Sequence, residues 1–324
     1  MKAFWYGMRT YDTLEIAKQL SAETGISLSW SVESPDERNV GLSAGCELVC
    51  VAPCALPVSL IETMARQGCK ALFSAAIGYD FIDLSACRCL GLKVYNAAYP
   101  PEGVADYTVM LMLMALRKMK QVLERTKLQD YSLEGKIGRS LSDCTVGVIG
   151  TGRIGRAVIQ RLSGFGSQVL CYDIHQSGDL PYVSLEELLG RSDVVTLHVN
   201  ATGDNFHLLN KERLALMKRN AVLVNCARGQ LVDTSALVDA LLSGGLGGAA
   251  LDTWEGENGR MYYNRVGKVL PDKNLAILSS LPNVILSPHA AFYTERNMEL
   301  EIRSVFEGMV AFRDGKESER EVRL

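Results

Sequence analysis

Ionisable side chains follow several short apolar stretches in the second half of the chain, where predicted strands end. Arg228 follows VLVNCA, His289 follows VILSP, and Glu257 lies shortly after GGAALD. Arginine presents a planar fork that binds a carboxylate with two hydrogen bonds, and histidine can exchange a proton near neutral pH. A carboxylate such as Glu257 can hold an imidazole and stabilise its protonated form. Together these residue types could bind an acid and deliver a proton to it.

A glycine-rich turn precedes these residues in the chain. VGVIGTGRIG places Gly150, Gly152 and Gly155 in the pattern G-x-G-x-x-G, between a predicted strand and a predicted helix. The first glycine allows a tight turn, the second lets a pyrophosphate approach the backbone, and the third packs the helix on the strand. Free N–H groups at the helix N-terminus would bind the phosphates.

An acidic residue, Asp173, ends the next predicted strand. A carboxylate there can accept hydrogen bonds from ribose hydroxyls and would repel a 2′-phosphate, so the pattern predicts NAD rather than NADP. The alternative is that Asp173 is an ordinary turn residue. Beside a nicotinamide, Arg228, Glu257 and His289 would form a set suited to oxidoreduction: His289 gives a proton to a carbonyl oxygen, and Arg228 orients the substrate carboxylate.

The elements that must position these side chains alternate regularly from residue 144 onward. Strands are predicted at 144–150, 168–173, 193–199, 221–227, 247–253 and 283–289, with helices at 152–165, 184–190, 210–217 and 233–245. Strands this rich in Val, Leu and Ile, joined by helices, indicate a parallel sheet covered on both faces. Ligands bind outside the carboxyl ends of such strands.

The first hundred residues predict a second α/β unit, with strands at 46–52, 70–75 and 92–97 and helices at 14–23, 60–68 and 84–91. Residues 101–126 predict one long helix that is apolar nearly all round, which suggests burial against more than one neighbour, including a second subunit. An amphipathic helix is predicted from Glu295, and the charged segment 313–324 is interpreted as a solvated end. A length of 324 residues also favours two domains.

Composition excludes several classes of function. The net charge is −3 and the basic residues are scattered, which argues against nucleic acid as a partner. The longest apolar run, 107–116, is too short to cross a membrane, and the N-terminus lacks the features of a signal peptide. The nine cysteines, an odd number, indicate reduced thiols in a cytoplasm.

Other potential ligand residues are interpreted as structural. The spacing of Cys46, Cys50 and Cys54 suggests a metal site, but no CxxC pair and no nearby histidine supports it, so no metal is predicted. His198 and His207 are interpreted as structural residues, the former as a neighbour of the cofactor. His175 is interpreted as a surface residue.

Four segments together resemble a known family. VGVIGTGRIG, NCARGQLVD, ALDTWEGE and SPHAAFYT are similar to the signatures of the D-isomer-specific 2-hydroxyacid dehydrogenases, in order and over nearly the whole chain. The resemblance is greatest to the D-lactate dehydrogenase branch, including the D-lactate dehydrogenases of vancomycin-resistance operons. The long connection from Asp252 to His289 resembles the insertion of lactate-type members.

The resemblance implies two doubly wound, Rossmann-like or flavodoxin-like parallel α/β domains. Residues 1–100 and 293–324 would form a discontinuous substrate-binding domain, and 101–292 an NAD-binding domain. It also implies a homodimer joined largely through the NAD-binding domains.

Residue roles carried over from the family fall into three groups. The catalytic set is Arg228, Glu257 and His289. In addition to the three glycines, the cofactor contacts are Arg153, Ile154, Asp173, Val199, Asn200, Asn205, Cys226, Ala227 and Asp252. The substrate contacts are Ile77, Gly78, Tyr99, Arg228 and Phe292.

Two positions depart from many lactate-type members. Ala75 stands where a basic residue is common, which bears on the substrate pocket, and Asn200 stands where proline is common, which bears on cofactor packing.

Three hypotheses follow. The leading one is NADH-dependent reduction of a 2-oxo acid, pyruvate first, to the D-2-hydroxy acid; the stereochemistry comes from the resemblance alone. The second is a dehydrogenase for bulkier branched or aromatic 2-oxo acids. The third is a non-catalytic scaffold that senses NADH, against which the retained Arg, Glu and His set argues.

Overall fold

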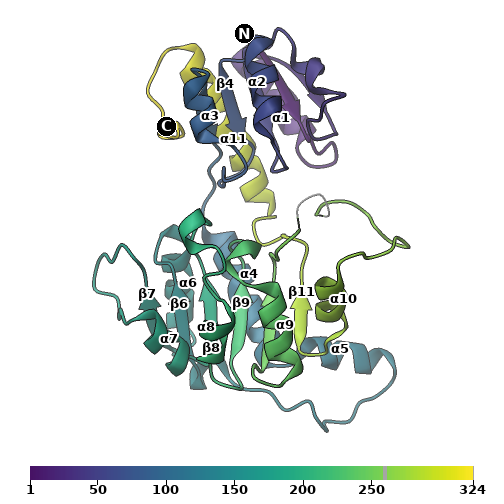
Figure 1. Ribbon diagram of the computed structural model, residues 1–324, viewed down its shortest axis with the longest axis vertical. Coiled ribbons are helices and arrows are strands. Elements are labelled where there is room, and N and C mark those ends of the chain that lie inside the picture. Colours follow the sequence, from purple (N-terminus) through teal and green to yellow (C-terminus); the bar gives the residue numbers. More distant parts are fainter. Residues whose placement is uncertain (258–260, 324) are drawn as a thin grey trace. The chain divides into compact units, whose positions relative to one another are not determined.

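The computed structural model describes residues 1–257 and 261–323 and divides the chain into two compact units (Figure 1). Unit 1 consists of Met1–Pro100 and Tyr293–Leu324, and unit 2 consists of Pro101–Phe292. Each unit is a parallel sheet between layers of helices. The chain therefore enters unit 2 once, completes it, and returns to unit 1 for its last helix.

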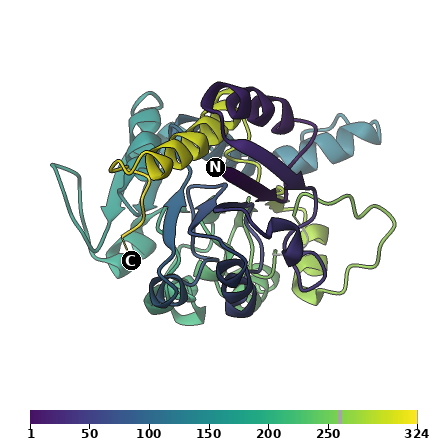
Figure 2. The ribbon, with the colours of Figure 1, turned by 90° about the horizontal axis from the view of Figure 1, so that it is seen from above.

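Unit 1 contains a five-stranded sheet in the order β2-β1-β3-β4-β5. Its strands are β1 (Lys2–Tyr6), β2 (Ser27–Ser31), β3 (Leu48–Val51), β4 (Ala71–Ser74) and β5 (Lys93–Asn96), all parallel. Helices α1 (Leu14–Thr24) and α11 (Glu295–Arg313) pack on one face, and α2 (Val58–Arg66) and α3 (Leu84–Cys89) on the other (Figure 2). This strand order is the flavodoxin-like one.

Three cysteines of unit 1 lie in its apolar core. Cys46, Cys50 and Cys69 are buried among apolar side chains of the two sheet faces. Burial raises the pKa of Cys69 to about 12, so its thiol stays neutral. Among the described residues no group of His, Cys, Asp or Glu could hold a metal ion. These cysteines act as small apolar core residues.

Unit 2 contains a six-stranded parallel sheet in the order β11-β10-β9-β8-β6-β7. The strands are β6 (Thr145–Ile149), β7 (Gln168–Tyr172), β8 (Val194–Leu197), β9 (Val222–Asn225), β10 (Gly248–Leu251) and β11 (Val284–Leu286). The core on one face is completed by α7 (Leu185–Arg191), α8 (Lys211–Ala215), α9 (Thr234–Leu242) and α10 (Lys273–Ser280). Helices α4 (Glu102–Leu116) and α6 (Arg153–Ser163) pack together, and α4 also contacts β9, β10 and β11. The strand order reverses beside β6, and that switch point is where a ligand crevice is expected.

The prediction of one continuous helix over 101–126 is wrong. The segment forms α4 and then α5 (Met119–Lys127), separated by Lys118 with φ +51°. The carbonyl of Leu116 accepts a hydrogen bond from the N–H of Arg139 at 3.0 Å. A Cβ on Gly138 would lie 2.5 Å from the same carbonyl oxygen, so the two chain segments are in close contact. Tertiary pairing of a helical carbonyl thus accompanies the break, and local sequence does not encode it.

The prediction that the charged C-terminal segment is merely solvated is also wrong. The N–H of Val322 donates to the Val94 carbonyl at 2.8 Å, and the N–H of Asn96 donates to the Arg320 carbonyl at 3.0 Å. Glu321 pairs antiparallel with Tyr95 and forms an ion pair with Lys93 at 3.0 Å. The segment therefore protects the edge of β5, which would otherwise expose unpaired backbone groups.

Strands β1 and β2 and helix α10 are additional to the predicted elements. In the described part of the chain, no helix combines the length and the apolar character needed to span a membrane.

Candidate active site at the carboxyl edge of unit 2

Six residues follow the carboxyl ends of the strands of unit 2. They are Gly150, Asp173, His198, Arg228, Asp252 and His289. Because all six strands are parallel, these residues lie along one edge of the sheet. The sequence pattern predicted this gathering, and the local contacts show how each side chain is held.

The three glycines of the phosphate-binding pattern differ in what they permit. Gly150 has φ +94°, and a Cβ on it would lie 2.6 Å from the carbonyl oxygen of His198. A Cβ on Gly155 would lie 1.9 Å from the Gly150 carbonyl oxygen. Gly152, the residue before α6, has no atom within 4 Å of a would-be Cβ. The turn is therefore tight on the protein side and open at the helix N-terminus, which fits a bound pyrophosphate.

Asp173 is ionised and held in place beside this turn. Its carboxylate accepts from the N–H of Thr151 at 2.6 Å, from the Thr151 hydroxyl at 3.0 Å and from the N–H of His175 at 2.9 Å. Burial opposes ionisation, but these hydrogen bonds outweigh it and lower the pKa of the carboxyl. The Thr151 hydroxyl also lies 2.9 Å from the Tyr182 hydroxyl, and neither residue is among those predicted from the sequence.

His198 is not suited to acid catalysis. Its Nε2 lies 3.0 Å from the Thr196 hydroxyl, and its Nδ1 is buried with no hydrogen-bond partner in the described residues. Burial lowers the pKa of His198 to about 3, so the ring stays neutral at physiological pH. This agrees with its interpretation as a structural residue.

Asp252 anchors the loop that carries His289. It is fully buried, and its carboxylate accepts from the Ser287 hydroxyl at 2.6 Å and from the N–H groups of Ala290 at 2.9 Å and Ala291 at 2.8 Å. Its carbonyl accepts from the N–H of His289 at 2.9 Å. A buried carboxylate satisfied by three donors is a rigid anchor. The loop geometry is demanding, since His289 itself has φ +53°.

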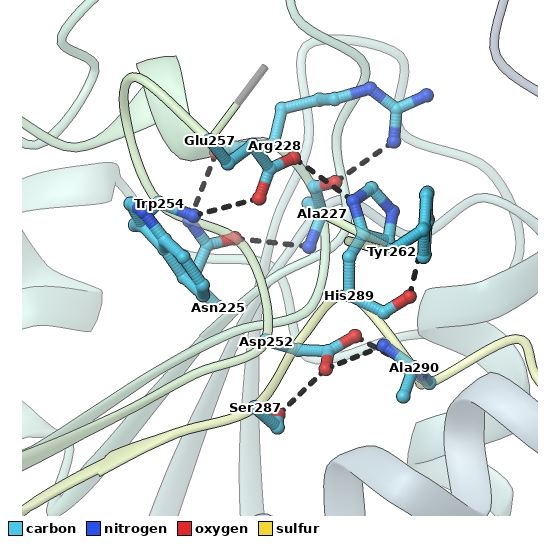
Figure 3. A network of polar contacts seen from close by, with 11 residues as sticks. Asn225, Ala227, Arg228, Asp252, Trp254, Glu257, Tyr262, Ser287, His289 and Ala290 are labelled. Atoms are coloured by element: carbon cyan, nitrogen blue, oxygen red, sulfur yellow. Dashed lines mark hydrogen bonds and ion pairs between the residues drawn. The ribbon is translucent and has the colours of Figure 1, made fainter. Parts of the chain in front are cut away.

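His289 and Glu257 form the central pair of the site (Figure 3). Nδ1 of His289 lies 2.9 Å from Oε1 of Glu257, and Oε2 of Glu257 accepts from the N–H of Trp254 at 3.2 Å. An ionised carboxylate can only accept, so Nδ1 carries a hydrogen. Nε2 is then the nitrogen that can take up and release a proton.

The turn that carries Arg228 packs against the turn that carries Glu257. The amide of Asn225 donates to the Arg228 carbonyl at 2.9 Å, and Nη1 of Arg228 donates to the Ala227 carbonyl at 2.9 Å. A Cβ on Gly229 would lie 2.0 Å from the carbonyl carbon of Trp254. Only glycine allows this approach, which brings the two turns into direct contact (Figure 3).

Residues 109–291 match the family model described as "D-isomer specific 2-hydroxyacid dehydrogenase, NAD binding domain". The chain belongs to this family. It is 42% identical to a D-specific alpha-keto acid dehydrogenase of Enterococcus faecium over 264 aligned residues. The alignment covers 82% of each protein. It is 33% identical to a D-lactate dehydrogenase of Lactobacillus delbrueckii subsp. bulgaricus, covering 100% of this chain and 99% of that one.

A solved structure of D-2-hydroxyisocaproate dehydrogenase matches with a TM-score of 0.87 and 35% identity, covering 99% of each chain. These matches confirm the predicted family, fold class and cofactor: the protein is an NAD-dependent dehydrogenase of the D-2-hydroxyacid and D-lactate type.

The other predicted cofactor residues of this dehydrogenase also lie at the carboxyl edge of unit 2. Arg153 and Ile154 begin α6, while Cys226 and Ala227 follow β9. Val199, Asn200 and Asn205 belong to the loop after β8, where the Asn205 amide donates to the Asn200 carbonyl at 2.7 Å. Burial raises the pKa of Cys226 to about 12, so this position presents a neutral thiol.

The predicted substrate residues are divided between the two units. Ile77 and Gly78 follow β4, and Tyr99 follows β5, so all three lie at the carboxyl edge of the sheet of unit 1. The Ile77 carbonyl accepts from the Asn96 amide at 2.8 Å, and the Gly78 carbonyl accepts from the Ser74 hydroxyl at 2.7 Å. Their carbonyls therefore have partners within unit 1.

Phe292 belongs to unit 2, where its ring lies edge-on to His289 with centroids 6.2 Å apart. Tyr262 joins them, with its ring edge-on to Phe292 at 6.4 Å and its hydroxyl 3.4 Å from the His289 carbonyl. The insertion between β10 and β11 thus supplies an aromatic neighbour for the histidine. Nothing in the spacing of the sequence singled out Tyr262.

Proposed function

We propose that this dehydrogenase reduces a 2-oxo acid, with pyruvate preferred, to the D-2-hydroxy acid. The observation that carries the proposal is the 2.9 Å contact between His289 Nδ1 and Glu257 Oε1, on a sheet edge that also bears Arg228 and the glycine-rich turn. A histidine held in this way can donate the proton that completes an alcohol.

The roles divide as follows. When bound, NADH would supply the hydride that reduces the carbonyl carbon of the substrate. His289 gives its proton to the carbonyl oxygen, and Glu257 holds the imidazole in place. Arg228 binds the substrate carboxylate and polarises the carbonyl. In unit 1, Ile77, Gly78 and Tyr99 keep the substrate-contact roles that the family implies, with the backbone N–H groups of Ile77 and Gly78 as carboxylate donors. In unit 2, Phe292 keeps a substrate-contact role.

The cofactor would be held by the open N-terminus of α6 at its pyrophosphate and by Asp173 at its adenosine ribose. Gly150, Gly152, Arg153, Ile154 and Gly155 would surround the pyrophosphate. Val199, Asn200, Asn205, Cys226, Ala227 and Asp252 would complete the site toward the nicotinamide.

We expect Asp173→Ala to allow NADPH to compete with NADH. The lowered pKa of Asp173 means that a negative charge repels a 2′-phosphate at neutral pH, and alanine removes that charge. The ratio of kcat/KM for NADH to that for NADPH should fall at least about tenfold. Asp179→Ala, on an exposed residue of the same connection, is the control. An unchanged ratio would remove Asp173 from the ribose site.

A second substrate class is favoured by a specific observation. The aromatic rings of Tyr262 and Phe292 lie next to His289. Such apolar rings can pack against a branched or aromatic side chain of a substrate. The likeness to D-2-hydroxyisocaproate dehydrogenase supports this alternative, while the likeness to D-lactate dehydrogenase over the full chain supports pyruvate.

The experiment that tests the proposal follows NADH loss with pyruvate, branched and aromatic 2-oxo acids, glyoxylate and hydroxypyruvate. A higher kcat/KM for pyruvate supports the leading function, and a higher value for a bulky acid supports the alternative. No turnover with any of them would support a non-catalytic NADH-sensing scaffold instead.

We also propose a homodimer in which the NAD-binding domains meet. Unit 2 carries a hollow of about 630 Å³ lined mainly by apolar side chains of α4 and its surroundings: Val109, Met110, Leu113, Met114, Met119 and Phe165, with Asp106, Arg117 and Arg161. Helix α5 has no buried residue, and Leu128, Leu133 and Ile137 beyond it are largely exposed. Apolar surface of this extent is typical of an interface.

Met110→Glu should convert the dimer to monomer, because it places a charge on this apolar surface. Light scattering coupled to size-exclusion chromatography should give twice the mass of one chain for the wild type and the mass of one chain for the variant. Leu90→Glu is a matched control, since Leu90 is similarly exposed (38% against 39%) but lies in unit 1. A monomeric wild type would refute the dimer.

We place the enzyme in the cytoplasm. All nine cysteines are free, and most are buried in the two cores, as expected for a chain that folds and works under reducing conditions.

A further inference from the structure

His207 has contacts that its interpretation as an ordinary structural residue does not explain. It lies in the loop after β8 with φ +51°. Its Nε2 lies 2.9 Å from Oε1 of Glu255, and its Nδ1 lies 3.8 Å from Oδ2 of Asp233. Each ring nitrogen of His207 therefore faces a carboxylate.

The partner of His207 belongs to the turn that carries the proposed catalytic carboxylate. Glu255 and Glu257 are separated only by Gly256, which has φ +79°. His207 binds Glu255 at 2.9 Å, and His289 binds Glu257 at the same distance. One short turn is therefore held by two histidines that come from the loops after β8 and β11.

His207 is also tied to the segment that follows Arg228. Its N–H donates to the Gln230 carbonyl at 2.9 Å, and the N–H of Leu209 donates to the Leu231 carbonyl at 2.9 Å. The Phe206 ring stacks on the imidazole with centroids 3.9 Å apart and keeps it in place. The His207 side chain thus contacts the Glu255–Glu257 turn, while the His207 backbone binds the segment that follows Arg228.

We propose that His207 is a positioning residue for the reduction. It fixes the Glu255–Glu257 turn relative to the Arg228 turn and so holds Glu257 where it can bind His289. This inference rests on the proposed function. A misplacement of about 1 Å in a catalytic group can lower the rate about a hundredfold. His207 can therefore affect the rate through the position of Glu257, without contacting the substrate.

The test compares His207→Gln and His207→Ala with Glu212→Gln, at an exposed residue of helix α8, which follows the loop of His207. We expect both His207 variants to lower kcat at least about tenfold while the Kd for NADH stays within about threefold. Glu212→Gln should leave both quantities unchanged.

A double-mutant cycle with Glu255→Gln isolates the contact. If His207 acts through Glu255, the double variant should lose no more activity than the worse single variant. Independent losses that multiply would overturn the proposal, as would an unchanged kcat in both His207 variants.

A readout that does not depend on turnover separates this inference from the proposed function. Trp254 is adjacent to Glu255, and the other two tryptophans, Trp5 and Trp30, lie in unit 1. In 5-fluorotryptophan-labelled protein, the ¹⁹F resonance of Trp254 should shift in His207→Gln while those of Trp5 and Trp30 stay in place. An unmoved Trp254 resonance overturns the positioning role, whereas absence of wild-type turnover with every 2-oxo acid overturns only the proposed function.

Discussion

Replacing His289 with glutamine is expected to lower kcat for 2-oxo acid reduction by at least about a hundredfold. Glutamine can donate a hydrogen bond but cannot release a proton at neutral pH, so the alkoxide formed by hydride addition would have to be protonated by water. Because Glu257 would still hold the neighbouring turn through Trp254, the site should otherwise keep its shape.

NADH binding distinguishes loss of the proton donor from loss of the fold. The Kd for NADH of His289→Gln, measured by fluorescence titration, should stay within about threefold of the wild type, because the proposed pyrophosphate and ribose contacts lie at β6 and β7. His289→Asn is a second variant, since asparagine tolerates the left-handed backbone of this position better than glutamine does. Near-normal turnover in either variant would contradict the proton-donor role.

The strand-end residues could be predicted because two local rules apply to them. Strands of unit 2 are near-continuous apolar runs, and in a parallel sheet their carboxyl ends meet on one edge. Gly150, Asp173, Arg228 and His289 could therefore be assigned to one edge from their positions in the chain. The family match then confirmed the fold class and the cofactor.

Other features depend on contacts between residues far apart in the sequence. The Thr151 hydroxyl donates to the Asp173 carboxylate across 22 residues, and it also lies 2.9 Å from the Tyr182 hydroxyl across 31 residues. The break between α4 and α5 accompanies the pairing of Leu116 with Arg139, and the C-terminal segment pairs with β5. No periodicity or motif encodes such partners, so an isolated histidine such as His207 looked unremarkable.

Gly229→Ala should lower kcat/KM for the 2-oxo acid by about a hundredfold. A Cβ at this position would lie 2.0 Å from the carbonyl carbon of Trp254, 2.1 Å from its oxygen and 2.4 Å from the N–H nitrogen of Glu255. These are backbone atoms of a turn bound at both glutamates, so relief requires the whole turn to move. Glu257 would then be displaced from His289, although no catalytic side chain has been changed.

The matched control is Gly190→Ala, on helix α7, where a Cβ would meet only the Leu216 carbonyl oxygen at 3.8 Å. Alanine in a helix is favoured over glycine by about 0.5–1 kcal/mol, so this variant should keep its activity and gain slightly in Tm. Gly229→Ala should instead lose activity while far-ultraviolet circular dichroism and NADH binding remain close to those of the wild type, because the clash is confined to two turns. Activity within about threefold of the wild type would mean that the turn can shift without cost, and the contact between the Arg228 and Glu257 turns would then not control the geometry of the proton donor.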